Sequence, residues 1–158
     1  MDMEQFYQRN YRIVYCYLFS LCQDIHTAED LTSETFLRAI QKIDSYDDRI
    51  KASTWLCTIG RNLYRTQLKR ESRRTDLEKI ILADPDSPED ALLRKEQIRL
   101  LVKAVEELEE IKRQVFLLRR QGMSFREIGD VLGRTENWAR VSYFRIKETI
   151  LQRMEELK

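Results

Sequence analysis

The sequence contains few of the residues that interrupt regular structure, with four glycines and two prolines among 158 residues. This scarcity, together with 42% hydrophobic and 35% charged residues, is typical of an all-helical protein. No strand pattern of useful length, internal repeat or low-complexity tract is present. We therefore predict an all-α fold class.

Histidine and paired cysteines are also scarce. The three cysteines, Cys16, Cys22 and Cys57, form no Cys-x-x-Cys pair, and His26 is the single histidine. A zinc site needs more ligands than these, and a Cys22–His26 catalytic pair has no other catalytic group to support it. A glycine-rich phosphate loop is missing too. We expect no catalytic residues, no metal and no cofactor, and we expect the cysteines to pack as small apolar side chains.

The sequence also lacks a long hydrophobic run. No segment approaches the length of a membrane-spanning helix, and the first residues, MDMEQFYQRN, do not form a signal peptide. We therefore expect a cytoplasmic protein without membrane insertion.

The formal net charge of +1 hides a strong segregation of charge. Residues 61–74 carry six basic side chains and one acid, whereas residues 75–90 carry six acids and one lysine. Both prolines, Pro85 and Pro88, lie in the acidic stretch, which marks a flexible acidic linker. We predict two small helical-bundle domains, 1–74 and 88–158, joined by a linker at 75–87, with Ser87-Pro88-Glu89-Asp90 as a helix start.

Three helices are expected in the first domain. The first has apolar residues at helical spacing, the second is capped by Thr27 and reaches Ile43, and the third begins near Ala52. On the third helix an apolar stripe lies opposite a basic stripe, because an offset of two residues turns a helix by about 200°. The apolar stripe is Trp55, Ile59 and Leu63, and the basic stripe is Arg61, Arg65 and Lys69. The basic stripe is either an ordinary solvated face or a surface for a polyanion.

Residues 124–147 have the pattern of a helix, a glycine turn and a second helix. Ser124 and Glu127 form a capping box, Gly133 provides the turn, and Thr135 caps the second helix. The inward stripe of the second helix is Ala139, Tyr143, Ile146 and Ile150, and the opposite side carries Asn137, Arg140, Val141, Phe144 and Arg145. Such a helix either enters a DNA major groove or belongs to a simple packing unit.

Four features in register resemble those of one family. They are Ala28-Glu29-Asp30-Leu31-Thr32 with Glu34 and Phe36-Leu37, then Trp55-Leu56, then Arg61-Asn62-Leu63, and, after the acidic linker, the helix-turn-helix. In this order they resemble the extracytoplasmic-function (ECF) sigma factors of the bacterial sigma-70 family, which are promoter-specificity subunits of RNA polymerase. The resemblance covers nearly the whole chain.

The resemblance implies that 1–74 is region 2, which binds the polymerase clamp helices and opens the −10 element. The polymerase-binding residues would be Asp30, Glu34, Phe36 and Leu37. Adjacent helical residues project about 100° apart. Either one of Phe36 and Leu37 is therefore exposed for the partner, or both are buried.

The resemblance also assigns the −10 contacts to region 2. The loop from Tyr46 to Ser53 would capture a flipped base, with Tyr46 either as the stacking surface or as a loop anchor. Asn62 would contribute to the base pocket, because its amide both donates and accepts hydrogen bonds. Arg61, Arg65 and Lys69 would hold the phosphates of the same strand.

Region 4, at 88–158, would engage the polymerase flap and read the −35 element. The −35 contacts would be Asn137, Arg140, Val141, Phe144, Arg145 and Lys147, with Lys147 on phosphate. The chain departs from the common pattern at Ser33, at Thr66, at Arg134 and over residues 137–141. Trp138 either packs against the preceding helix or meets a phosphate through its indole N–H.

The implied partners are core RNA polymerase, promoter DNA and an anti-sigma factor. The acidic linker is either a nucleic-acid mimic in the polymerase or a solvated tether. An alternative is a helix-turn-helix repressor or activator that works without polymerase, with the first domain as a dimerisation or sensor module. A protein-binding adaptor would leave the basic stripe unexplained, and an enzyme has the least support.

Overall fold

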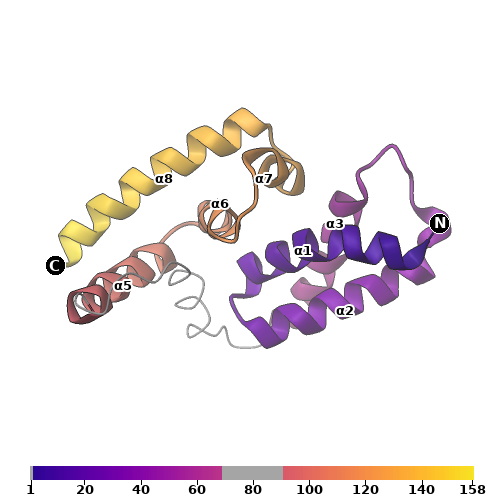
Figure 1. The fold of residues 1–158 in the computed structure, drawn as a ribbon, viewed down its shortest axis with the longest axis horizontal. Coiled ribbons are helices and arrows are strands. Elements are labelled where there is room, and N and C mark those ends of the chain that lie inside the picture. The colour runs from indigo at the N-terminus through magenta and orange to yellow at the C-terminus, as the bar shows by residue number, and fades with distance from the viewer. Residues whose placement is uncertain (1, 69–90) are drawn as a thin grey trace.

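The computed structural model describes residues 2–68 and 91–158, with side chains from 94 onward in the second stretch. All of its regular elements are helices, and the described residues contain no strand (Figure 1). The all-α prediction is therefore confirmed. The predicted linker at 75–87, the helix start at Ser87 and the basic residue Lys69 lie outside the described residues.

The first three long helices pack against one another (Figure 1). They are α1 (Met3–Cys22), α2 (Ile25–Gln41) and α3 (Ala52–Gln67), with a 3-10 turn at Ile43–Ser45 between the last two. The prediction that Thr27 caps α2 is wrong. Asp24 is the cap: its backbone is extended, its carboxylate accepts from the His26 N–H at 3.2 Å, and the Thr27 hydroxyl donates to it at 3.0 Å.

The buried face of α3 differs from the predicted apolar stripe. Leu56, Cys57 and Gly60 are buried, whereas the predicted stripe of Trp55, Ile59 and Leu63 is half-buried. A Cβ at Gly60 would lie 2.9 Å from both Leu18 Cδ2 and Thr35 Oγ1. The three helices therefore cross closely at this glycine, and the centre of the core lies about 100° around α3 from Trp55.

The second group consists of α5 (Ala91–Glu106), α6 (Glu110–Arg120), α7 (Phe125–Leu132) and α8 (Glu136–Leu157). The predicted helix-turn-helix is formed by α7 and α8. Both hydrogen bonds of the Ser124–Glu127 capping box are present, Gly133 ends α7 with a φ of 70°, and Thr135 caps α8 by accepting from the Trp138 N–H. The inward residues of α8 are as predicted, except that Tyr143 is only half-buried.

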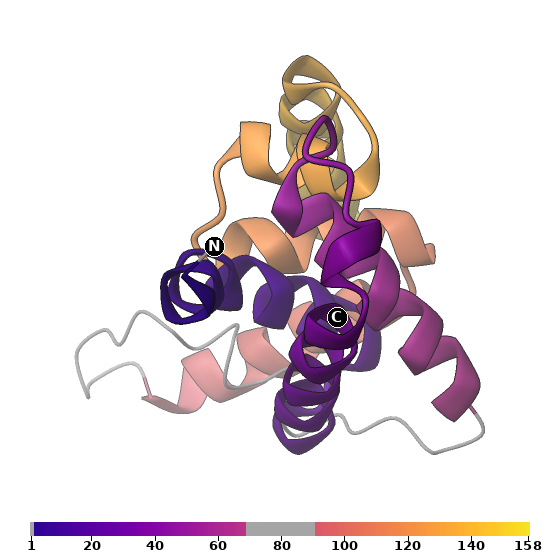
Figure 2. The same ribbon diagram turned by 90° about the vertical axis from the view of Figure 1, so that its right-hand side faces the viewer.

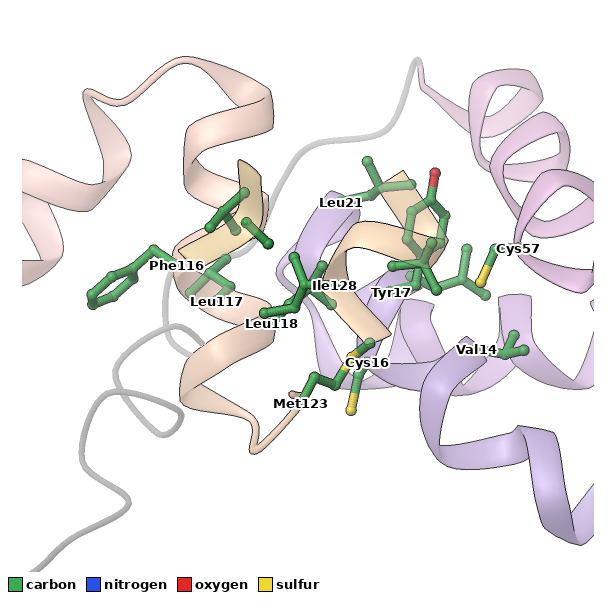
Figure 3. Close-up of a cluster of buried hydrophobic side chains, with 14 of the residues drawn as sticks. Val14, Cys16, Tyr17, Leu21, Cys57, Phe116, Leu117, Leu118, Met123 and Ile128 are labelled. Carbon is green, nitrogen blue, oxygen red and sulfur yellow. The ribbon is translucent and has the colours of Figure 1, made fainter. Parts of the chain in front are cut away.

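The two helical groups share one continuous hydrophobic core. α6 packs on α1, and Figure 3 shows Cys16 and Tyr17 of α1 gathered with Leu118, Met123 and Ile128 of the second group. Gln121 Nε2 also donates to the Cys16 carbonyl at 3.2 Å. Because these contacts join residues about a hundred positions apart, no local sequence pattern predicts them.

Two ion pairs lie at the edge of this contact. Arg12 of α1 pairs with Glu127 of α7 at 2.8 Å, and Lys51 pairs with Asp130 of α7. The beginning of α3 accordingly lies beside α7 (Figure 2), where the Thr54 hydroxyl also reaches the Asp130 carbonyl at 3.5 Å. The structure is thus a closed arrangement, which we define by the shared core and these two ion pairs.

Candidate nucleic-acid interface

The helix-turn-helix is held rigidly by a close approach at Gly129. A Cβ on this residue would lie 2.8 Å from the carbonyl oxygens of Arg134 and Thr135, so no larger residue fits without moving the turn. The Arg134 N–H donates to the Gly129 carbonyl at 2.7 Å. Together with the left-handed Gly133, these contacts fix the direction in which α8 leaves the turn.

The solvent-facing side of α8 carries all of the predicted −35 residues. Val141 is 39% exposed and Phe144 is 52% exposed. The remaining predicted residues, which are polar or charged, are also exposed: Asn137, Arg140, Arg145 and Lys147. This side therefore combines amide, guanidinium and apolar groups in the way that base edges in a major groove require.

An aromatic cluster with cations around it forms one flank of this side. The Phe125 ring lies 5.7 Å from Tyr143 and 6.2 Å from Phe144, and the Arg119 guanidinium lies 4.1 Å from the Phe125 centroid. Arg140 lies 5.5 Å from the same ring. Neither Phe125 nor Arg119 was among the residues predicted from the sequence, because their contacts join different helices.

Arg140 also has an acidic partner. Its Nη2 atom lies 3.3 Å from Glu136 Oε1, one turn earlier on α8, and both side chains are about half exposed. A surface pair of this kind contributes a few tenths of a kcal/mol. It therefore orients the guanidinium and is easily exchanged for a stronger anion.

Trp138 is half-buried, packs against the hydrophobic core, and carries a cation on its ring. The guanidinium of Arg134 lies 5.3 Å from the indole centroid. Of the two alternatives for Trp138, the structure shows packing against the protein.

The loop between α2 and α3 is closed by Tyr46. Its ring stacks on Trp55 with centroids 4.8 Å apart, and its hydroxyl donates to the Ile50 carbonyl at 2.7 Å. Burial, and then the nearby Asp48 and Asp47, raise the pKa of Tyr46, so the hydroxyl stays protonated and able to donate. Tyr46 is thus a loop anchor in this structure, with one ring face taken by Trp55.

The predicted basic stripe of α3 is divided between solvent and protein. Asn62 and Arg65 are exposed, but Arg61 is half-buried. Burial raises the pKa of Tyr17, and the nearby positive charge of Arg61 opposes this rise. The Nε atom of Arg61 is buried without a hydrogen-bond partner among the described residues. Arg61 therefore borders the core, and Asn62 and Arg65 form the surface that a nucleic acid can reach.

The predicted polymerase-binding residues of α2 are separated by their burial. Phe36 is 5% exposed and lies in an aromatic cluster with Phe6 and Tyr7, whereas Leu37 is 58% exposed. The charged residues of the set, Asp30 and Glu34, lie at the surface, and Glu34 pairs with Arg38 at 3.0 Å. Of the adjacent pair Phe36 and Leu37, it is Leu37 that is available to a partner.

Two apolar residues missed by the sequence analysis extend this surface. Ile40, one turn after Leu37, is 50% exposed, and Tyr7 of α1 is 42% exposed. Because the Tyr7 ring packs on Phe36, the neighbour of Leu37 in the sequence, we group Tyr7, Leu37 and Ile40 as one exposed apolar patch, and such patches bind other proteins. The spacing of three residues from Leu37 to Ile40 could have indicated it.

A groove of about 630 Å³ lies between α5, α6 and α8. Apolar side chains line part of the groove, including Leu101, Phe116, Tyr143, Ile150 and Leu151. The charged side chains that line it are four basic residues and one acid: Arg94, Arg120, Lys147, Lys158 and Glu155. The groove therefore favours an apolar segment with acidic residues beside it.

No group of histidine, cysteine and acidic side chains suited to a metal ion occurs within 2–68 and 91–158. The three cysteines are free and buried, and burial raises the pKa of Cys16 to about 11 and that of Cys57 as well. Cys22 is buried with its thiol directed to the Asp24 carbonyl, whereas His26 is exposed. In the described stretches no helix is long and apolar enough to cross a membrane.

The geometry defines an all-helical protein of the helix-turn-helix DNA-binding class, with a second exposed surface on its first three helices. Comparison with known families agrees with this class. Residues 6–74 match the model of Sigma-70 region 2, and residues 98–150 match that of Sigma-70, region 4.

Characterised relatives align along most of the chain. It is 33% identical over 143 residues to the ECF RNA polymerase sigma factor BldN of Streptomyces coelicolor, an alignment that covers 87% of this chain and 54% of BldN. It is 29% identical over 157 residues to the ECF RNA polymerase sigma factor SigW of Bacillus subtilis, covering 91% and 84% of the two chains. The chain thus spans about half the length of BldN and most of SigW. It belongs to the sigma-70 family, as an ECF sigma factor.

A solved structure has a similar fold. The sigma factor RpoE from Bartonella quintana, crystallised with the anti-sigma factor NepR, superposes with a TM-score of 0.57 at 19% identity. The match covers 98% of this chain and 97% of RpoE. At this identity, the likeness concerns the fold.

Proposed function

We propose that this chain directs core RNA polymerase to specific promoters, with residues 1–74 as region 2 and residues 88–158 as region 4. The observation that carries the proposal is the presence of two exposed nucleic-acid-type surfaces on one chain, the outer side of α8 and the Asn62–Arg65 side of α3. A repressor that reads duplex DNA needs the first surface alone. The chain would act in the cytoplasm, where polymerase and DNA meet, and would perform no bond chemistry itself.

Region 4 would read the −35 element through the outer side of α8. Arg140 and Arg145 suit guanine edges, each worth about 1–3 kcal/mol of discrimination when bidentate. Val141 and Phe144 are exposed and apolar, as contacts to thymine methyl groups require. Asn137 lies at the first turn of α8, where recognition helices contact bases, and Lys147 would meet phosphate.

Region 2 would capture unstacked bases of the −10 element. Exposed Asn62 would bind a base edge, and exposed Arg65 would hold a phosphate, with Arg61 and Lys69 beside them. Tyr46 would offer the ring face that Trp55 leaves uncovered. Stacking on such a ring contributes about 1–3 kcal/mol per base, which offsets the cost of unpairing.

Two surfaces would bind the polymerase. The patch of Tyr7, Leu37 and Ile40, with Asp30 and Glu34 on the same helix as the two aliphatic residues, would bind the clamp helices, and buried Phe36 would support it from the core. The groove between α5, α6 and α8 would accept the flap. An anti-sigma factor, as in the RpoE complex, would regulate the chain by covering such surfaces.

The closed arrangement has to open for this function. The −35 and −10 elements are centred about 25 base pairs apart, or about 85 Å of duplex. In the closed arrangement Lys51 touches Asp130, so the chain lengths from Tyr46 to Lys51 and from Asp130 to Asn137 keep Tyr46, proposed to meet the −10 element, within about 60 Å of Asn137, proposed to meet the −35 element. A closed chain therefore cannot hold both elements of one straight promoter.

The decisive experiment is transcription with purified components. The chain, mixed with core polymerase, should yield transcripts from particular promoters of a genomic DNA library, and core polymerase alone should not. If the chain shows no affinity for core polymerase at micromolar concentration, the proposal is wrong. Binding to duplex DNA without polymerase binding would support the repressor or activator alternative instead.

A further inference from the structure

We propose that Arg134 contacts a DNA phosphate beside the −35 element and that Trp138 positions it, an inference that rests on the proposed reading of DNA by α8. Arg134 is the residue immediately before the cap of α8, and it is exposed. It therefore places a positive charge directly before the first turn of the helix that is proposed to read DNA.

The backbone at Arg134 is fixed from three sides. Gly133 before it adopts a φ of 70°, Thr135 after it caps α8, and its own N–H is bonded to the Gly129 carbonyl at 2.7 Å. The missing side chain at Gly129 lets the turn approach within 2.8 Å of where a Cβ would be. The guanidinium therefore starts from a rigid base, and little backbone entropy is lost when it meets a ligand.

The side chain is held as well. The Arg134 guanidinium lies 5.3 Å from the centroid of the Trp138 ring, and Trp138 is itself packed on the core. A guanidinium over an aromatic face keeps its N–H donors in the plane of the group, free for a planar anion. No acidic partner of Arg134 occurs within the described stretches, in contrast to Arg140, which pairs with Glu136.

The position of the pair on α8 indicates what it contacts. Trp138 lies about 100° around the helix from Asn137, and so at the edge of the side that faces the bases. When a recognition helix enters the major groove, its edges approach the sugar-phosphate walls, where arginine side chains bind phosphate oxygens. Phosphate contacts position a protein on DNA without reading its sequence.

The test measures how DNA affinity depends on salt concentration and on base sequence. A phosphate contact contributes to the salt dependence of the affinity and is the same for every base sequence. The probe is a duplex of about 20 base pairs, or two helical turns, enriched from a random pool by the full wild-type chain. Arg134→Gln should weaken binding by the same factor on this duplex and on its single-base variants. The slope of log affinity against log salt should fall by about 0.9, so the advantage of the wild type should shrink about threefold between 50 and 200 mM salt.

Three further variants separate charge from stacking. Arg134→Lys should keep the salt slope of the wild type, because the charge remains. Trp138→Ala should lower the slope by releasing Arg134, and Trp138→Phe should restore it. A purely structural role for Trp138 would change thermal stability without changing the salt slope.

The matched control is Arg99→Gln on α5, an exposed arginine outside the helix-turn-helix that pairs with Glu96. It should leave both affinity and slope unchanged. An unchanged slope in Arg134→Gln, or a loss that depends on the base sequence, would overturn the inference. If the wild-type chain enriches no duplex at all, the proposed DNA reading by α8 fails instead.

Discussion

The ion pair between Lys51 and Asp130 allows the closed arrangement to be tested directly. It joins the beginning of α3 to α7, and the two side chains are 56% and 32% exposed. Lys51 lies in the loop from Tyr46 to Ser53 but is not one of the side chains proposed to contact DNA or polymerase, and Asp130 lies on α7 outside those contacts. Changing this pair should therefore alter the balance between closed and open chains without removing a contact that function needs.

The size of the effect follows from the exposure of the pair. A partly exposed ion pair contributes about 0.2–1 kcal/mol, and two like charges at the same place cost a similar amount. Lys51→Glu or Asp130→Lys alone should therefore favour the open state by about 0.4–2 kcal/mol, or roughly twofold to thirtyfold in the ratio of open to closed chains. The double exchange should return the ratio close to that of the wild type.

The assay is the distance between two fluorescent labels on the full chain. The labels are placed by His26→Cys on α2 and Glu148→Cys on α8, which are both exposed positions. The native cysteines are buried, so the introduced thiols react first. Each single charge reversal should increase the population of long distances, and added salt should increase it in the wild type because it screens the pair.

The charge exchange also has a clear opposing outcome. If both single reversals and the double exchange give the same distance distribution as the wild type, the ion pair does not hold the two helical groups together. If the double exchange stays as open as the singles, the effect comes from lost packing at these residues and the electrostatic reasoning is wrong.

Three further substitutions test the proposed interface. Arg140→Ala should weaken binding to a −35 duplex about tenfold in a gel-shift assay, because a bidentate base contact is lost. A core-binding assay should show unchanged affinity for polymerase, and an equal loss of both affinities would mean that Arg140 is structural. Asn62→Ala should impair promoter opening, measured by permanganate footprinting, more than recruitment, and normal opening would exclude it from the base pocket. Gly129→Ala should lower the free energy of unfolding in urea by about 1 kcal/mol, since crowding against backbone at 2.8 Å costs about 1–3 kcal/mol and outweighs the gain in helix propensity; unchanged stability would show that the turn can move.

Local sequence signals predicted the helix-turn-helix well. The capping box, the left-handed glycine and the Thr135 cap each depend on residues within one or two turns, and all three are present in the structure. The predicted start of α2 was wrong because Asp24 and Thr27 are both good capping residues. Asp24 is the cap in the structure, where its backbone is extended. Periodicity identified α3 but not its buried face, because Gly60 makes room for Leu18 and draws the helix closer on that side.

The candidate site was predicted in its residue types and only partly in its geometry. Sequence placed Arg140, Val141 and Phe144 on one side of α8, and the structure exposes them together. It could not show that Phe125 completes an aromatic cluster with cations beside it, because that contact joins two helices. Nor could it show that Tyr46 stacks on Trp55, since this depends on the path of a loop.

The sequence alone determined the helical class, the helix-turn-helix and its caps, and the segregation of basic and acidic residues. These features depend on interactions between residues close in the chain, whose spacing can be read directly. Only the tertiary structure decided which of Phe36 and Leu37 is exposed, how far Arg61 is withdrawn from solvent, and that α1 and α6 share a core closed by Lys51 and Asp130. Those outcomes depend on the packing of distant surfaces, where small differences in shape and burial select one arrangement among many that the same local pattern allows.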